Sequence, residues 1–383
     1  MKRKSLIFFI IFLIFVLSSC GQGGVNLTPV PTDTLLPTHT LTPSPSPTLE
    51  PTEEPEVEQT IRISFVGDCM FGMQNEFDLP DLFPQVYERS NSVTYPFDYV
   101  LDYFKSDDIT VINYEGTLTN HTKQADKPWR FRGKPEYANI LKESSVEIAL
   151  LANNHSYDYL EEGYIETRNA LKSHGVEPLG HNEVYKVSVK DVEIVFIAAN
   201  FILVEDTNVM AERYEDVLPL IRENKKEDNI VIVNLHWGKE LEKVPPKEQR
   251  DVAHLYIDEG AELIVGHHPH LLQGIENYKG KYIVYSLGNF AFGGSRSATN
   301  PDTIIYVHEW TVKGGKILGD DSFAVPCYIT STDELNFKGV LANNFRPIPL
   351  EDERKQACIN LILERSKPLE HGIEAVSVLE LSL

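Results

Sequence analysis

Basic residues are scarce in this chain of 383 residues. It has 35 lysines and arginines against 57 aspartates and glutamates, so its formal net charge is −22. Proteins that bind nucleic acid or anionic lipid through charge need a basic surface. The composition therefore argues against nucleic acid as a partner. An acidic surface is also ordinary for a soluble exported protein, so the charge alone identifies no substrate.

Long apolar runs are also missing. The run from Leu6 to Leu17 is shorter than the roughly 20 residues that a membrane-spanning helix needs. It follows a basic start and precedes Ser18-Ser19-Cys20, a pattern typical of a lipoprotein signal peptide. We therefore expect residues 1–20 to be removed as a signal peptide and Cys20 to be lipidated. This N-terminal lipid anchor would hold an exported, extracytoplasmic protein at the cell membrane without spanning it.

Apart from Cys20, the chain has three cysteines, and its first part has little that could form a core. Residues 21–59 are rich in proline and threonine, a composition that favours an extended, disordered tether. The folded part is expected over 60–310, with a C-terminal extension over 311–383 that completes the domain or packs on it. Cys69 is expected to be a small buried residue, whereas Cys327 and Cys358 could pair or remain free.

Five short apolar runs each lead into residues that could hold a metal ion. Short runs rich in β-branched residues and bounded by glycine or asparagine are typical of buried strands. Helical patterns between them, over 160–174, over 210–224 and in a segment opened by Pro246, predict an α/β sheet protein. In open α/β sheets the ligand site lies at the carboxyl ends of the strands. The runs cover residues 61–66, 111–112, 148–152, 230–235 and 263–265.

The residues that follow these runs have the chemistry of metal ligands. Asp68 and Glu115 carry negative charge, and a carboxylate can bridge two cations roughly 3.5–4 Å apart. His268 and His270 lie two positions apart in a loop that Pro269 restricts, so they can point at neighbouring ions. His236 ends another run. Taken singly, Asp68 is equally well explained as a turn residue or helix cap, and a lone histidine such as His236 is more often packed than ligating.

A second group of residues could serve proton transfer. In Asn153-Asn154-His155, the amide oxygen of Asn154 could bind a metal ion and leave His155 free to move a proton. Asp158 lies three residues further on and could orient the His155 ring, as carboxylates near metal sites often do. Asparagines after a strand are also common turn formers, so this motif indicates a site only together with the others.

Three arginines are candidate substrate contacts. Arg130 and Arg132 alternate with aromatic residues, and Arg296 lies between two serines after a glycine pair. Guanidinium groups suit carboxylate or phosphate recognition. For all three, an ordinary surface loop explains the sequence equally well.

Six motifs occur in one order within residues 60–310, and together they resemble the CapA-type poly-γ-glutamate capsule biosynthesis family. That family is similar to calcineurin-like metallophosphoesterases. The resemblance implies a four-layer αββα sandwich of the metallophosphoesterase type and a centre of two divalent ions, with Mn, Fe and Zn equally compatible. The motifs are Gly67-Asp68, Asn113-Tyr114-Glu115-Gly116, Ala152-Asn153-Asn154-His155 with Asp158, His236-Trp237-Gly238, Gly266-His267-His268-Pro269-His270 and Ser286-Leu287-Gly288-Asn289-Phe290.

The resemblance also implies a role for each matched residue. One metal would be held by Asp68 and His270, Glu115 would bridge, and the other metal would be held by Asn154, His236 and His268. His155 would protonate the leaving group. Two positions depart from the metallophosphoesterase pattern: Met70 replaces the histidine of Asp-x-His, and Ser156 replaces the acid that usually follows the Asn-His pair.

Three functions follow as hypotheses. The first is a membrane-anchored CapA-like protein of poly-γ-glutamate synthesis or export, with a two-metal, hydrolase-like site. The second is a non-catalytic accessory subunit that works with the membrane subunits of a complex handling an anionic polymer. The third is a secreted metal-dependent phosphodiesterase or phosphatase acting on a phosphoester substrate.

Overall fold

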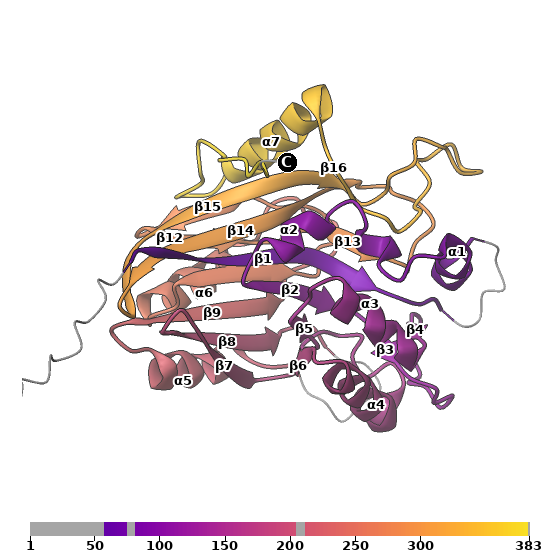
Figure 1. Ribbon diagram of the computed structural model, residues 1–383, viewed down its shortest axis with the longest axis horizontal. Coiled ribbons are helices and arrows are strands. Elements are labelled where there is room, and N and C mark those ends of the chain that lie inside the picture. Colours follow the sequence, from indigo (N-terminus) through magenta and orange to yellow (C-terminus); the bar gives the residue numbers. More distant parts are fainter. Residues whose placement is uncertain (1–56, 75–80, 204–210, 382–383) are drawn as a thin grey trace, which may run out of the picture. The chain divides into compact units, whose positions relative to one another are not determined.

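The computed structural model describes residues 57–74, 81–203 and 211–381. The expected signal peptide, residues 1–20, and nearly all of the expected tether, residues 21–59, lie outside this part of the chain. Among the described residues, no helix combines the length and apolar character needed to cross a membrane. The described part is an α/β fold with two large mixed β-sheets (Figure 1).

The first sheet has eight strands within the described residues. They are β1 (Gln59–Met70), β2 (Ile109–Tyr114), β5 (Ile148–Leu150), β6 (Glu177–Leu179), β13 (Asn289–Phe292), β14 (Asp302–Lys313), β15 (Lys316–Tyr328) and β16 (Ile348–Pro349). Their order is β16-β15-β14-β1-β2-β5-β6, with β13 paired to β1 off this path. β1, β2, β5 and β6 are parallel, and β14 to β16 add antiparallel strands on the other side of β1. The C-terminal part of the chain thus contributes β15 and β16 to this sheet.

The second sheet has six strands in the described part. They are β7 (Glu183–Val189), β8 (Val192–Asn200), β9 (Asn229–His236), β10 (Leu263–His267), β11 (Ile275–Tyr278) and β12 (Lys281–Val284). Their order is β11-β12-β10-β9-β8-β7. The four inner strands are parallel, and β7 and β11 form antiparallel edges. A small ribbon joins β3 (Thr117–Leu118) to β4 (Arg132–Gly133).

One apolar core lies between the two sheets, because alternate residues of each strand point to opposite faces. Ile63 and Phe65 of β1 share this core with Ile194 and Phe196 of β8. The intervening Val195 and the neighbouring strand residue Val231 instead belong to a cluster on the outer face of the second sheet.

Helices cover the outer faces of both sheets. Buried residues of α2 (Leu101–Lys105), α3 (Ala138–Glu143) and α4 (Leu160–Ser173) pack on the first sheet. Those of α5 (Tyr214–Asn224) and α6 (Lys247–Asp258) pack on the second. The expected helices after Leu160, after Pro246 and up to residue 224 are therefore present. The remaining helical elements are α1 (Phe83–Ser90), α7 (Asp352–Ser366), η1 (Tyr95–Phe97) and η2 (Pro135–Tyr137).

The three described cysteines carry free thiols. Cys69 is buried, as expected. Cys327 and Cys358 are also buried and are not bonded to each other. Of the two possibilities that the sequence left open for this pair, the structure therefore has the unpaired one.

Candidate metal centre

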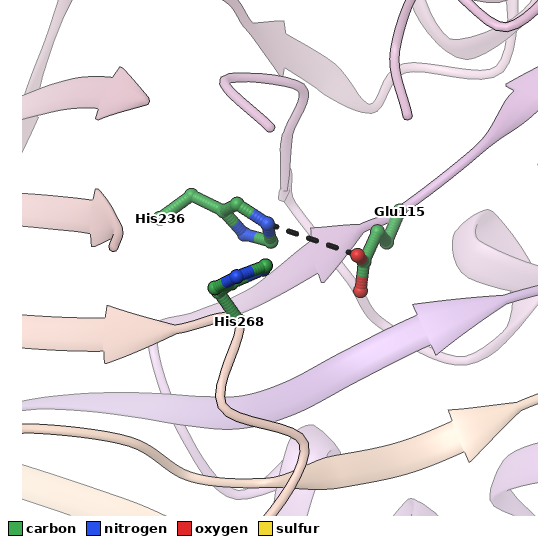
Figure 2. Close-up of side chains that lie close together, drawn as sticks. All are labelled: Glu115, His236 and His268. Carbon is green, nitrogen blue, oxygen red and sulfur yellow. Dashed lines mark ion pairs between the residues drawn. The ribbon is translucent and has the colours of Figure 1, made fainter. Parts of the chain in front are cut away.

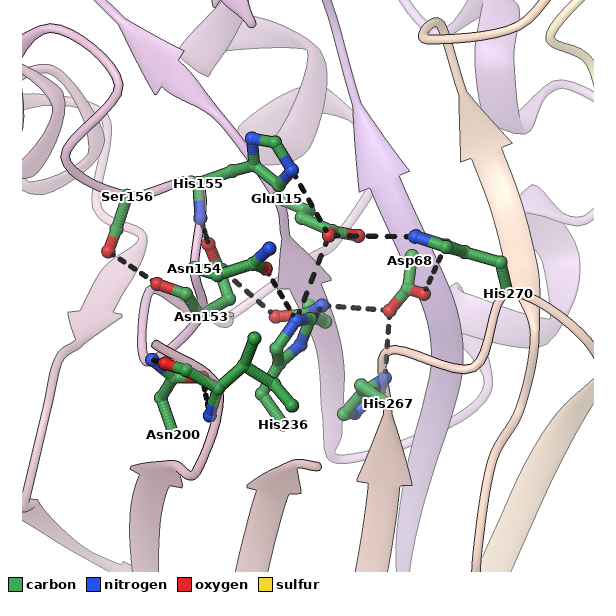
Figure 3. Close-up of polar contacts among 12 residues, drawn as sticks. Asp68, Glu115, Asn153, Asn154, His155, Ser156, Asn200, His236, His267 and His270 are labelled. Atoms are coloured by element: carbon green, nitrogen blue, oxygen red, sulfur yellow. Dashed lines mark hydrogen bonds and ion pairs between the residues drawn. The ribbon is translucent and has the colours of Figure 1, made fainter. Parts of the chain in front are cut away.

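The carboxyl ends of strands from both sheets meet at one place. In Figure 1 the arrowheads of β1, β2, β8 and β9 point to the same side. Polar residues at or just after the ends of β1, β2, β5, β9 and β10 converge there (Figure 3). This arrangement follows from parallel strands, whose carboxyl ends share one edge of a sheet. The residues gathered there are Asp68, Glu115, Asn153, Asn154, His155, His236, His267, His268 and His270.

Asp68, Glu115 and His270 form a first group that could hold a metal ion. Their candidate ligand atoms lie within 4.8 Å of one another. His270 Nδ1 is 3.1 Å from Asp68 Oδ2, and His270 Nε2 is 3.8 Å from Glu115 Oε1. Asn289 Oδ1, 2.9 Å from His270 Nδ1, contributes to orienting the ring.

Glu115, His236 and His268 form a second such group (Figure 2). His236 Nε2 lies 3.7 Å from Glu115 Oε1 and 2.9 Å from Asn154 Oδ1. The His236 and His268 rings are 4.8 Å apart between centroids. Glu115 belongs to both groups, so its carboxylate lies where a ligand shared by two ions would have to lie.

The chemistry of these donors fits divalent cations. Glu115 is fully buried, and neither carboxylate oxygen has a hydrogen-bond partner among the described residues. Burial raises the pKa of Glu115 to about 8, and it lowers the pKa of His268 to about 4, which keeps that imidazole neutral. Carboxylate, amide and neutral imidazole ligands together suit ions such as Mn²⁺, Fe²⁺ or Zn²⁺.

His270 supplies positive charge when no cation is present. Burial lowers its pKa, but the carboxylates of Glu115 and Asp68 outweigh burial and raise the pKa to about 10. The same contact acts on Asp68: burial raises its pKa, and His267 and His270 hold it well below its usual range. A metal ion would take over this role from the proton on His270, so binding should release that proton.

His155 and Asp158 are in the contact that the sequence suggested. His155 Nδ1 is 2.8 Å from Asp158 Oδ2, and its Nε2 is 4.0 Å from Glu115 Oε1. Burial lowers the pKa of His155 despite the adjacent carboxylate. The Phe131 amide also donates to Asp158 Oδ2 at 2.6 Å. The ring is therefore held with Nδ1 towards Asp158 and Nε2 towards the cluster.

Lys127, Asn113 and His267 also contact residues of the centre, and the sequence indicated no role for them. Lys127 is buried, with Nζ 2.8 Å from Asp158 Oδ1 and 2.7 Å from the Asn154 carbonyl oxygen. Asn113 donates to Asp68 Oδ1 at 2.8 Å, and His267 Nδ1 lies 3.4 Å from the same oxygen. Asn113 and His267 lie inside motifs noted above, whereas nothing in the sequence near Lys127 indicates its role.

The methionine at the Asp-x-His position packs in an apolar cluster. Met70 is buried against Phe131 and Phe292. Phe131 lies 4.6 Å from the His155 ring and Phe292 lies 5.3 Å from the His270 ring, centroid to centroid. This position thus supplies part of an apolar wall, and the first group contains three residues with metal-binding atoms.

A groove of about 510 Å³ lies beside the centre. His155 and His268 line it together with Lys127, Trp129 and Lys239. The three arginines considered as substrate contacts are not among its described lining residues. The Arg132 guanidinium lies 4.9 Å from the Tyr159 ring centroid, Arg130 Nη1 donates to the Ala125 carbonyl, and the Arg296 carbonyl accepts a bond from the Asn343 amide.

Fold and centre together define an α/β protein with buried Asp, Glu and His groups that could bind metal ions. Comparison with known proteins gives the family. The chain belongs to the bacterial capsule synthesis protein PGA_cap family, whose model matches residues 62–294. The expected relationship to CapA-type proteins is thereby confirmed.

Two relatives and one solved structure illustrate the similarity. The PGA biosynthesis protein CapA of Bacillus subtilis (strain 168) is 32% identical over 268 residues, which is 66% of this chain and 68% of that protein. The capsule biosynthesis protein CapA of Bacillus anthracis is 30% identical over 272 residues, 65% of this chain and 64% of that protein. A phosphatase from Mycoplasma pneumoniae covers 70% of this chain and 95% of its own at 12% identity and a TM-score of 0.44. Likeness at that level carries no functional conclusion.

Proposed function

We propose that this protein is an exported, lipid-anchored CapA-like protein that acts in poly-γ-glutamate capsule synthesis or export through a two-metal, hydrolase-like site. The observation that carries the proposal is the position of Glu115, which belongs to two buried groups of metal-capable residues at once. Membership of the capsule synthesis family supports the pathway, and the anchor follows from the sequence around Cys20.

In the proposed centre, each residue has a task set by its position. Asp68, Glu115 and His270 would hold one ion, and Glu115 with Asn154, His236 and His268 would hold the other. Two such ions, when bound, polarise a phosphoryl or acyl group and make water a better nucleophile near neutral pH.

Proton transfer in the proposed reaction falls to His155. Its Nδ1 is held by the Asp158 carboxylate, so the proton delivered to a leaving group comes from Nε2, the nitrogen nearest Glu115. The wall formed by Met70, Phe131 and Phe292 covers one side of the centre with apolar surface and keeps water from that side.

Measuring the metal content and the activity of the same protein preparations tests this proposal. The purified full-length protein should contain Mn, Fe or Zn, and Asp68→Ala and His268→Ala should lose both metal and activity. His254→Ala is the control, because His254 pairs with Glu276 outside the centre and should retain both. If the wild-type protein contains no metal, and both site variants keep full activity, the proposed centre is wrong.

A non-catalytic accessory role is the second candidate, and Met70 favours it. With methionine at the Asp-x-His position, one of the two groups has fewer ligands than in related enzymes. In a capsule-forming host, His155→Ala should abolish polymer production if the site is catalytic. Full production by that variant, with normal metal content, would support a role in assembling a membrane complex. Turnover of bis(p-nitrophenyl) phosphate with Mn²⁺ would instead favour a general phosphodiesterase.

A further inference from the structure

A chain of largely buried hydrogen bonds lies beside the candidate metal centre and connects the loop after β5 to the end of β8. Glu212 Oε1 lies 2.9 Å from His181 Nδ1, and His181 Nε2 lies 3.0 Å from Ser156 Oγ. Ser156 Oγ donates in turn to the Asn153 carbonyl oxygen at 2.9 Å. The His181 and Glu212 side chains are 11% and 5% exposed, so water competes little for these contacts.

One end of this chain is fixed to the second sheet. Glu212 Oε2 accepts a hydrogen bond from the backbone N–H of Asn200 at 2.7 Å. Asn200 is the register partner of His236 where β8 and β9 end, and the Phe201 amide donates to the His236 carbonyl at 2.9 Å. The Glu212 carboxylate is therefore tied to the strand ends that carry His236.

The other end is fixed to the loop that follows β5 in the first sheet. Asn153 Nδ2 donates to Asn113 Oδ1 at 3.2 Å and to the Tyr114 carbonyl at 2.9 Å, and Asn153 Oδ1 accepts from the His155 amide at 3.1 Å. Asn153 thereby sets the conformation of the two residues that follow it, Asn154 and His155 (Figure 3).

Ser156, His181 and Glu212 are hydrogen-bonded in the same sequence as a serine nucleophile, its histidine base and the acid that orients the base. The surroundings of Ser156 do not suit that function. Ser156 is 1% exposed and is not among the described residues that line the groove beside the centre. A substrate in that groove would meet His155 and not its neighbour. The arrangement is better suited to holding the loop in place.

We propose that His181 and Glu212 are positioning residues that hold Asn154 and His155 opposite His236. This inference rests on the proposed metal site. The ligands of that site come from two sheets joined by an apolar core, and apolar contacts are not directional. A ligand set has to be held to about 0.5 Å, and the hydrogen-bond chain supplies the direction that the core does not.

Metal binding by the full-length protein tests this role without an activity assay. In His181→Leu we expect the affinity for Mn²⁺, measured by titration calorimetry, to fall by about 10- to 100-fold, the usual effect of losing an outer contact of a metal site. The d–d absorption spectrum of bound Co²⁺ should also change. His181→Gln, which can still donate to Glu212, should recover part of the affinity.

His254→Leu is the matched control. His254 pairs with the buried Glu276 at 2.9 Å, the same distance as in the His181–Glu212 pair, but away from the centre. We expect this variant to lose stability and to keep the wild-type Mn²⁺ affinity and Co²⁺ spectrum. A general loss of packing would lower metal affinity in both variants equally, and this result would refute the positioning role.

A second variant decides the matter if His181→Leu does not fold. Glu212→Met keeps the length of the side chain and removes both the partner of His181 Nδ1 and the acceptor for the Asn200 backbone N–H, so it should weaken Mn²⁺ binding. Wild-type affinity and spectrum in Glu212→Met would overturn the inference while the metal site stands. A wild-type protein that binds neither Mn²⁺ nor Co²⁺ would overturn the metal site and this inference with it.

Discussion

Replacing Glu115 with glutamine should have opposite effects on stability in the absence and in the presence of metal. Glutamine keeps the shape of the side chain and cannot ionise, so it avoids the cost of burial that raises the pKa of Glu115 to about 8. In the metal-free protein the Glu115 carboxylate is fully buried, and among the described residues neither oxygen accepts a hydrogen bond. Leaving a buried polar group unpaired costs about 1–3 kcal/mol, and more when it is charged.

The size of each effect can be estimated. The imidazolium of His270, 3.8 Å from Glu115 Oε1, offsets part of the cost in the metal-free protein. We therefore expect Glu115→Gln to raise the free energy of unfolding in EDTA by about 1 kcal/mol. Metal at 100 times the dissociation constant adds about 2.7 kcal/mol to the wild-type protein. If the substitution weakens binding about 100-fold, the same concentration adds only about 0.4 kcal/mol.

Urea unfolding of the full-length protein, in EDTA and in Mn²⁺, measures both effects. Glu276→Gln is the control, because Glu276 is equally buried but accepts bonds from His254, Tyr285 and the His371 amide. It should lose stability in EDTA and keep the full increment from metal. The reasoning is refuted if Glu115→Gln loses as much stability in EDTA as the control, or if its metal increment equals that of the wild type.

Three further outcomes are expected. Lys127→Met leaves the buried Asp158 carboxylate without its cation and should lower the free energy of unfolding by about 3–5 kcal/mol. Lys134→Met is the control: it removes an exposed ion pair and should change the free energy of unfolding by less than about 1 kcal/mol. Burial raises the pKa of Asp107 from 3.8 to about 7, so its contribution to stability is complete below pH 3.8 and is lost as the pH rises through 7. Asp107→Asn should remove this pH dependence of the free energy of unfolding, measured in urea. An unchanged pH profile in the variant would contradict the shift. If the site hydrolyses phosphodiesters, His155→Ala should lower kcat by about 10²- to 10⁴-fold with unchanged metal content, and loss of metal would show that His155 is instead part of the metal site.

The strand ends of this fold can be read from the sequence because each combines two local signals. A β-branched run marks the buried strand, and the polar residue after it marks the edge of the sheet. Asp68, Glu115 and His236 follow such runs, and the structure brings them together. Within one sheet the strand order need not be known, since all its parallel strands end at the same edge. That His236, from the second sheet, meets Asp68 and Glu115, from the first, depends on how the two sheets pack.

Residues outside that pattern could not be found in this way. Lys127 lies in a loop, and its role depends on Asp158, 31 positions further along the chain, with which it forms a buried ion pair. His181 and Glu212 are 31 positions apart and meet only because the two sheets pack together. Such pairs have no sequence period and no characteristic neighbours, so only the tertiary arrangement reveals them.

The candidate metal centre would also connect the two sheets. In the first sheet, Asp68 lies in β1 and Glu115 and Asn154 come after β2 and β5. In the second sheet, His236 ends β9 and His268 comes after β10. An ion held by ligands from both would add directional bonds across an interface whose core is apolar. Without the ion, the contact of His236 with Asn154 and the chain through His181 are directional links between the same strand ends. Ligands held in this way would need less ordering when an ion binds.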